Sequence, residues 1–429
     1  MNKATVGKIG FFSGLVLFCI VFFLDEIPGL SRSGQITLCV FLLMGVWWAT
    51  EALPLPITSL LPLVLFPLFG IAEIGVISKE FMNKVQFLFA GGFMIAIAMQ
   101  KWNLHRRVAL TILQYSDLSG KKIVASFMGI SALLSMWVMN TSTTIMLLPI
   151  AVSVCYVICD TVKGISEKER INLQVCVLLG IAYSSSIGGI ATPIGTGPNG
   201  FLIQFLAKEN IDIGFIDWFF IGLPVSLCLL PILWMILTYL LFPVRFEASE
   251  MAKKPIHNML KNLGPMSYEE KIVGIIFFVT ALCWIFRKMI NQIPTFAGLE
   301  DAVIAMIGGL SLFFFRSKDR KVSLLEWEDL EKKFPWGLIF LFGGGMALAY
   351  AVTTTGLAEW LANLIPLGLG LFALLALLIT LIVFLTELTS NIATTMTFIP
   401  IIYVISIKLG LNPLILMVPL TISASCAFM

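Results

Sequence analysis

The chain has 429 residues, of which 59% are hydrophobic and 12% are charged, and its formal net charge is +3. Its mean hydropathy of +0.97 excludes an ordinary soluble domain, in which about 25% of the residues are charged. So small a net charge gives no indication of nucleic-acid binding, and we expect no nucleic-acid partner. The composition predicts an integral membrane protein that lies in a lipid bilayer and is built from helices.

Apolar segments long enough to cross a bilayer as helices follow one another along the chain. They lie at residues 9–24, 36–52, 54–70, 85–100, 171–190, 215–242, 269–287, 300–316, 338–357 and 413–429. Two further apolar stretches, 123–160 and 369–408, are too long for one crossing and are interrupted by polar residues. We expect each of them to form a re-entrant hairpin, which enters and leaves the bilayer on the same side.

The basic residues support this topology, because cytoplasmic connections of membrane proteins are enriched in Lys and Arg. With the N-terminus in the cytoplasm and a re-entrant hairpin at 123–160, the cytoplasmic connections include 101–122, 243–268 and 317–335. Together with 160–170 and the N-terminus they contain most of the 28 Lys and Arg residues. A single crossing at 123–160 would place the basic connections outside. We therefore expect a multi-pass protein of the plasma (inner) membrane with a cytoplasmic N-terminus.

The two interrupted stretches are copies of one another. The segment "SMWVMNTSTTIMLLPI" (135–150) aligns with "TELTSNIATTMTFIPI" (386–401), so that Asn140 matches Asn391. In the predicted topology the first hairpin opens toward the inside and the second toward the outside. The repeat is then inverted, which is the architecture of many secondary transporters.

The polar residues of the repeat have a physical explanation at the tips of the hairpins. Backbone that leaves helical geometry inside a bilayer needs other hydrogen-bond partners, and it is tolerated where it lines a watery site. Free carbonyls at the end of one helix suit a hard cation, and free amides at the start of the next suit a carboxylate. The sequence thus predicts an ion and substrate site that is made twice. In the alternative, the hydroxyls bond back to the preceding turn and Asn140 and Asn391 only cap helices.

A third element is the segment "SSSIGGIATPIGTGPNG" at residues 184–200. Its glycines and prolines are incompatible with a continuous α-helix. We expect a broken helix here, with Thr192, Thr196 and Asn199 facing the tip of the first hairpin.

The chain resembles the divalent-anion/sodium symporters, a family of sodium-coupled dicarboxylate, citrate and sulfate carriers. The resemblance covers nearly the whole chain and rests on "WWATEALPLPITSLLPLVLFPLFG" (47–70), "SMWVMNTSTT", "ATPIGTGPN" and "FLTELTSNIATT". It implies an all-α polytopic protein with eleven spans, broken helices and two re-entrant hairpins. It also implies a homodimer and an elevator motion, in which the domain that bears the hairpins slides against a scaffold.

The resemblance also implies a division of the chain and a set of site residues. The scaffold is made of residues 1–122 and 214–365, and the transport domain of residues 123–213 and 366–429. The implied sodium-binding residues are Ser135, Asn140, Gly188, Gly195, Thr386, Thr389 and Asn391. The implied substrate-binding residues are Asn140, Thr141, Thr192, Ser390 and Asn391. We expect no cofactor and no metal other than Na⁺, since the eight cysteines are scattered singly along apolar segments.

The chain departs from the Ser-Asn-Thr signature of the family at both hairpin tips. Met139 takes the place of the serine before Asn140, and Ile392 takes the place of the threonine after Asn391. Each change removes a hydroxyl, which predicts a substrate with fewer acceptors, or a bulkier one, than a C4-dicarboxylate. In addition, the repeat places the partner of segment 184–200 beyond the end of the sequence, so we expect the chain to lack its last segments.

These observations predict a sodium-coupled symporter of small organic anions, namely di- or tricarboxylates, with an elevator-type alternating-access mechanism. A sodium-independent anion exchanger and a symporter of sulfate or another anion are the alternatives. Segments 135–150, 184–200 and 386–401 contain no Lys, Arg or His, so bound Na⁺ must balance the charge of the anion. This favours symport over exchange.

An enzyme is not expected, because no central span has paired aspartates and neither His105 nor His257 lies in a span. Glu387, close to the second tip, is a candidate for proton coupling. It is equally well interpreted as a structural carboxylate that accepts hydrogen bonds from free backbone amides.

Overall fold

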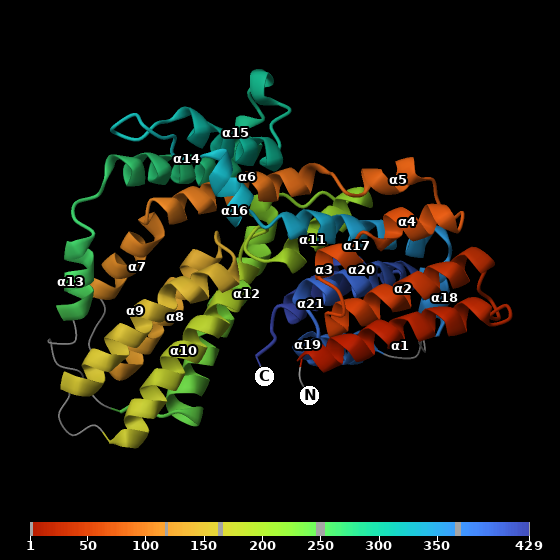
Figure 1. Ribbon diagram of the computed structural model, residues 1–429, viewed down its shortest axis with the longest axis horizontal. Coiled ribbons are helices and arrows are strands. Elements are labelled where there is room, and N and C mark those ends of the chain that lie inside the picture. Colours follow the sequence, from red (N-terminus) through yellow and green to blue (C-terminus); the bar gives the residue numbers. More distant parts are fainter. Residues whose placement is uncertain (1–2, 116–118, 162–165, 246–253, 365–369, 429) are drawn as a thin grey trace. The chain divides into compact units, whose positions relative to one another are not determined.

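The computed structural model describes residues 3–115, 119–161, 166–245, 254–364 and 370–428. These residues form helices joined by short connections, and a β-bridge joins Arg316 to Ser323 (Figure 1). Nine of the described helices are long and apolar enough to cross a bilayer. The predicted all-α polytopic fold is therefore confirmed. The predicted domain boundary at 365/366 and part of the predicted loop 243–268 lie outside the described residues.

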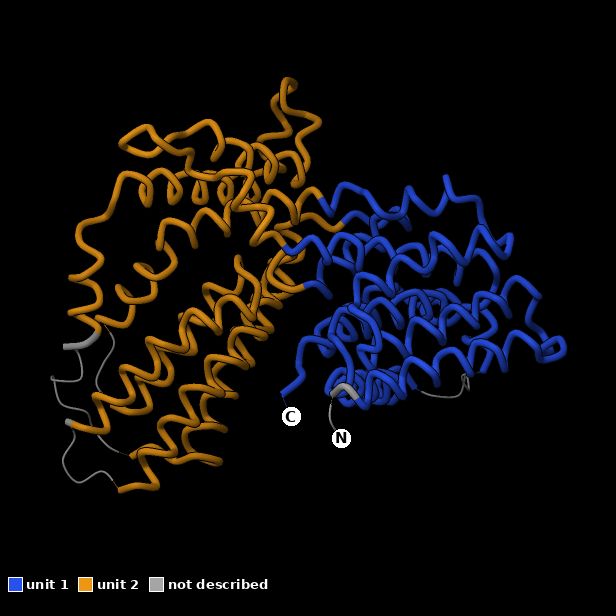
Figure 2. The backbone as a smooth tube through the Cα atoms, viewed as in Figure 1, with its two compact units in different colours: residues 1–86, 197–212, 335–429 blue, residues 87–196, 213–334 orange. Residues whose placement is uncertain are grey.

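The chain divides into two compact units, which Figure 2 shows in blue and orange. Unit 1 comprises residues 1–86, 197–212 and 335–429, and unit 2 comprises residues 87–196 and 213–334. This division by internal contacts differs from the predicted division into a scaffold and a transport domain. The predicted division describes which parts are expected to move together, and it stays a prediction.

Unit 1 contains the helices at both ends of the chain. They are α1 (Lys3–Phe23), α2 (Arg32–Thr50), α3 (Leu55–Thr58), α4 (Leu61–Leu68), α5 (Ile74–Lys79), α11 (Gly197–Lys208), α17 (Trp336–Thr354), α18 (Leu357–Asn363), α19 (Leu371–Leu388), α20 (Asn391–Lys408) and α21 (Leu414–Ala424). The predicted span 54–70 is split into α3 and α4, and Pro62 lies in the first turn of α4, where a proline is compatible with a helix start. Gly344 of α17 packs on the backbone of Ser59 at this split, since an added Cβ would lie 2.2 Å from Ser59 O.

Unit 2 contains the middle of the chain. Its helices are most of α6 (Lys84–Lys101), α7 (Leu104–Gln114), α8 (Gly120–Ser135), α9 (Asn140–Thr161), α10 (Glu167–Ile190), α12 (Phe215–Met235), α13 (Lys254–Asn262), α14 (Tyr268–Ile290), α15 (Asp301–Phe314) and α16 (Trp327–Lys333). A π-helical turn, Ile236–Leu241, extends α12. Helix α7 lies in the predicted connection 101–122 and makes an angle of 67° with α6. Asn103, with φ of 57°, forms the bend.

Each predicted hairpin consists of two helices joined by a short connection, and that these pairs re-enter the bilayer stays a prediction. Helices α8 and α9 are joined by residues 136–139, and α19 and α20 by residues 389–390. Helix α10 lies beside α8 and α9 (Figure 1). The third predicted element is also a break in the helix, because α10 ends at Ile190 and α11 begins at Gly197.

Candidate functional site

The tip of the first hairpin brings two side-chain oxygens together. Helix α8 ends at Ser135 and α9 begins at Asn140. The Ser135 hydroxyl donates a hydrogen bond of 2.6 Å to Oδ1 of Asn140. Ser135 is buried, whereas Asn140 is partly exposed. The pair therefore presents a hydroxyl oxygen and an amide oxygen on one side of the tip, and such oxygens are ligands for hard cations.

An aromatic cluster fixes the tip in unit 2. Trp137, within the tip, stacks on Phe215 at 5.9 Å and on Trp284 at 6.3 Å between ring centroids, and its edge meets Phe277 at 4.9 Å. Aromatic pairs at these separations are stabilising in addition to the area they bury. Helices α12 and α14 thus hold the loop between Ser135 and Asn140 in place.

The broken end of α10 has the hydrogen-bond partners that a freed backbone needs in a bilayer. The indole N–H of Trp218 donates to Ile190 O at 2.9 Å, and the Ser226 hydroxyl donates to Ile187 O at 2.7 Å. The Thr192 hydroxyl, just after the break, donates to Met136 O at the hairpin tip at 2.5 Å. The break and the tip are therefore tied together. Trp218 and Ser226 were missed from the sequence, although Ser226 is a polar residue in an apolar run.

Glycines let the broken helix approach the first hairpin closely. A Cβ added to Gly188 would lie 2.2 Å from Ala132 O, and one added to Gly189 would lie 2.8 Å from Asn140 Oδ1. A Cβ added to Gly195 would lie 2.5 Å from Gly189 O. Such contacts leave no room for a side chain. The backbone around Gly188 and Gly195 therefore lies close to the first hairpin, as the family resemblance implies.

The second hairpin repeats the arrangement in unit 1. The Thr386 hydroxyl lies 2.8 Å from Asn391 Oδ1 and 2.8 Å from Ala424 O, at the end of α21. Thr386 and Asn391 match Ser135 and Asn140 in the sequence repeat, so a hydroxyl before each tip bonds to the asparagine after it. The Thr389 hydroxyl is within hydrogen-bond distance of the Thr394 hydroxyl. Two oxygens, Asn391 Oδ1 and Ala424 O, thus lie next to the Thr386 hydroxyl.

The structural alternative explains only part of the polar row. The Thr144 hydroxyl donates to Asn140 O, and that of Thr395 donates to Asn391 O, so these two bond back to the preceding turn. The Ser135–Asn140 and Thr386–Asn391 pairs do not, because each spans a hairpin tip.

Glu387 accepts a hydrogen bond of 2.5 Å from the backbone amide of Phe428, which follows α21. This contact supports the structural interpretation of Glu387 over proton coupling.

The other residues singled out from the sequence lie outside the two hydroxyl–asparagine pairs. Thr141 is exposed, and Ser390 is the N-cap residue of α20 without a side-chain capping bond. Ile392 packs against α11, since a Cβ added to Gly197 would lie 2.4 Å from its Cδ1 atom. Met139 is 37% exposed. Asn199 belongs to unit 1, whereas the first hairpin, which it was expected to face, belongs to unit 2.

The chemistry of both half-sites is that of neutral oxygens. The described residues contain no group of three or more His, Cys, Asp or Glu side chains that could hold a metal ion. Hydroxyl, amide and backbone carbonyl oxygens fit a hard cation such as Na⁺. The first half-site belongs to unit 2 and the second to unit 1.

Comparison with known proteins identifies the family. Residues 8–429 match the family model described as the sodium:sulfate symporter transmembrane region. The chain belongs to the divalent-anion/sodium symporter family. Among the relatives is the sodium-dependent dicarboxylate transporter SdcS of Staphylococcus saprophyticus, with 36% identity over 100% of this chain and 84% of the relative. SdcS of Staphylococcus aureus strain USA300 is 37% identical over 98% of this chain and 82% of the relative.

Membership of the divalent-anion/sodium symporter family confirms the resemblance drawn from the hairpin and broken-helix motifs. It also confirms that the chain is a membrane transport protein and not an enzyme, because the relatives are transporters. The individual site residues stay predictions, which the geometry described above supports.

Proposed function

We propose that the chain is a sodium-coupled symporter of small organic anions, of the di- or tricarboxylate class, in the plasma (inner) membrane. Two relatives, of which the chain covers 84% and 82%, are named sodium-dependent dicarboxylate transporters. The observation that carries the proposal is the repeated pair of a hydroxyl and an asparagine oxygen, Ser135–Asn140 and Thr386–Asn391.

Each asparagine can link sodium binding to substrate binding. Oδ1 of Asn140 lies beside the Ser135 hydroxyl, and Oδ1 of Asn391 beside the Thr386 hydroxyl. An amide oxygen that faces a cation leaves its NH₂ group to donate in another direction, where a carboxylate accepts. Bound Na⁺ then orients the amide for the anion and balances its negative charge. Neither ligand alone gains the full interaction, which is the basis of coupling.

The remaining roles follow from the positions of the residues. In the first sodium site, the backbone near Gly188 and Gly195 adds carbonyl oxygens. In the second, the Thr389 hydroxyl and the carbonyl of Ala424 add oxygens. The substrate carboxylates take their hydrogen bonds from the two asparagines and from the hydroxyl residues Thr141, Thr192 and Ser390.

The proposed movement is an elevator in a homodimer whose N-termini are cytoplasmic. Residues 123–213 and 366–429 carry the sites and move, and residues 1–122 and 214–365 form the scaffold. The predicted inversion of the repeat supports this proposal, since transporters built in this way bind at the midplane and alternate access by moving one part against another.

Uptake into proteoliposomes tests the function. The purified protein is reconstituted and given labelled succinate, citrate, sulfate or a monocarboxylate, with Na⁺, Li⁺, H⁺ or choline as the external cation. We expect uptake of a carboxylate that requires an inward Na⁺ gradient. Uptake that is equal in choline and is accelerated by internal substrate would show an exchanger instead, and uptake of sulfate alone would show a symporter for sulfate.

A further inference from the structure

A cavity lined by both polar and apolar residues lies in unit 2, next to the first hairpin and separate from the oxygen pair at its tip. It has a volume of about 360 Å³ and lies between the α6–α7 bend, the first hairpin and the end of α16. This volume is within the range of about 300–1,000 Å³ of small-molecule sites. Its polar lining residues are Gln100, Asn103, His105, Ser142, Thr143 and Lys333.

The charge of this lining is positive. Lys333 is exposed, and no ion pair joins it to another described residue, whereas its neighbour Lys332 pairs with Glu328 at 2.6 Å. Among the described residues that line the cavity there is no carboxylate. A cavity that offers an ammonium group, amides and hydroxyls without a negative charge fits a small anion.

Thr143 gives a second and independent indication of a ligand. The residue is 1% exposed, and its hydroxyl oxygen has no hydrogen-bond partner among the described residues. Thr144, its neighbour, bonds to Asn140 O, so the lack of a partner is not a general property of this row. Buried polar groups are nearly always satisfied in native proteins. A ligand bound in the cavity would supply the missing partner.

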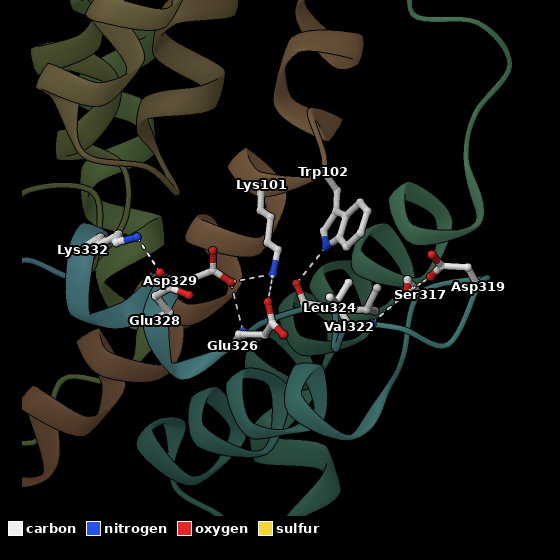
Figure 3. A network of polar contacts seen from close by, with 10 residues as sticks. All are labelled: Lys101, Trp102, Ser317, Asp319, Val322, Leu324, Glu326, Glu328, Asp329 and Lys332. Atoms are coloured by element: carbon white, nitrogen blue, oxygen red, sulfur yellow. Dashed lines mark hydrogen bonds and ion pairs between the residues drawn. The ribbon is translucent and has the colours of Figure 1, made fainter.

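The wall that carries Lys333 is held in place (Figure 3). Nζ of Lys101, at the end of α6, pairs with Asp329 at 2.6 Å and with Glu326 at 3.2 Å. The indole N–H of Trp102 donates to Leu324 O at 2.8 Å. These contacts fix α16 to the α6–α7 bend. The cavity is therefore preorganised, which lowers the cost of binding.

We propose that this cavity is a second binding site for a small carboxylate anion, with Lys333 as its cation and Thr143 as a buried donor. Thr143 is one helical turn beyond Asn140 on α9, so the two sites are neighbours along one helix. The basic connections place the cavity on the predicted cytoplasmic side. The site thus holds substrate between the cytoplasm and the hairpin tip. The choice of a carboxylate rests on the proposed function.

The direct test is equilibrium binding of labelled succinate to the purified full chain in the presence of Na⁺. The variants are Asn140→Ala, which removes the tip site, and Asn140→Ala combined with Lys333→Gln, with Thr143→Val or with Lys332→Gln. We expect Asn140→Ala to keep a succinate site that weakens about tenfold or more with Lys333→Gln or Thr143→Val. Lys332→Gln is the matched control, because Lys332 is exposed and does not line the cavity.

Two results would overturn the proposal. One is that Asn140→Ala retains no succinate binding although the parent binds succinate with Na⁺. The other is that Lys333→Gln and Lys332→Gln have the same effect. Lys333 is exposed, so its substitution leaves the fold intact even if Thr143→Val does not. Displacement by sulfate as effective as by unlabelled succinate would overturn the assignment to carboxylates. A parent without sodium-dependent transport contradicts the proposed function, whereas binding at Lys333 is measured independently of transport.

Discussion

At the scale of single residues, the oxygen end of each asparagine side chain has a hydroxyl partner across its hairpin tip. Oδ1 of Asn140 meets the Ser135 hydroxyl, and Oδ1 of Asn391 meets the Thr386 hydroxyl. Neither neighbouring side chain can replace an amide that accepts at one end and donates at the other. The loss of either asparagine should therefore disable ion and substrate binding together.

We predict that Asn140→Ala and Asn391→Ala each abolish uptake of whichever labelled carboxylate the parent transports into proteoliposomes. Alanine has no amide NH₂ group, and the neighbouring hydroxyls cannot take its place. The anion therefore loses the charge-assisted hydrogen bond from the asparagine. The measurement is initial uptake in proteoliposomes, with membrane insertion and size-exclusion elution as controls for folding. Normal uptake by either variant would mean that the asparagines only cap helices.

The residues beside the asparagines bear on specificity. Met139 is 37% exposed, and Ile392 packs on Gly197, so both tips present apolar groups where the family signature has hydroxyls. Carboxylate oxygens buried beside them lose a donor, at a cost of about 1–3 kcal/mol each.

The double substitution Met139→Ser with Ile392→Thr should therefore improve succinate uptake about tenfold, since about 1.4 kcal/mol is one decade of affinity. Succinate and a panel of monocarboxylates are compared in parent and variant at equal amounts of protein. If the parent already has high affinity for succinate and the variant shows no gain, these side chains do not face the substrate.

At the scale of elements, the contact between α8 and α10 decides how close the broken helix comes to the first tip. A Cβ on Gly188 would meet the backbone of Ala132 at 2.2 Å, and backbone cannot move aside as a flexible side chain can. The two helices must separate to accept a larger residue.

Gly188→Ala should therefore destabilise the protein by about 1–3 kcal/mol, as overpacking does, and should weaken the response to Na⁺. Gly129→Ala, in α8 of the same hairpin, is the matched control, because a Cβ there meets nothing within 4 Å. The control should be neutral or slightly stabilising, as alanine is the better helix former. The melting temperature in detergent is measured for both. An equal effect of the two substitutions would contradict the close contact.

Hydropathy and the internal repeat were enough to predict the long helices, the turn within each predicted hairpin and the break after Ile190, because each depends on a local pattern. The short helices α5, α16 and α18 were not predicted. Helix α16, for example, is charged and only seven residues long, and it is held by the contacts of Lys101 with Asp329 and Glu326, which are distant in sequence. Helix α7 was taken for a connection because its sequence is polar on one face.

The candidate site shows the same limit. The repeat identified Asn140 and Asn391, and the glycine run identified the broken helix. The carbonyls at the end of that helix accept hydrogen bonds from Trp218 and Ser226. Both donors belong to α12, too far along the sequence for a local motif to predict the contact. Only the fold brings them to Ile187 and Ile190. The cavity at Lys333 was likewise not foreseen, because its lining comes from three separate segments.

At the scale of the whole molecule, we propose that each hydroxyl–asparagine pair binds one sodium ion and that transport requires both ions. One pair belongs to each compact unit, and the repeat relates them. Two cooperating ions make transport a steep function of Na⁺ concentration, and loss of one ligand at either site shifts that function.

The measurement that tests this claim most directly is the dependence of carboxylate uptake on Na⁺ concentration in the parent, Ser135→Ala and Thr386→Ala. Ser126→Ala is the control, because that hydroxyl also lies on α8 but bonds back to Lys122 O. We predict a sigmoidal curve for the parent, a severalfold higher half-activating Na⁺ concentration for each of the two site variants, and no change for the control. A hyperbolic parent curve that neither Ser135→Ala nor Thr386→Ala shifts would contradict the account.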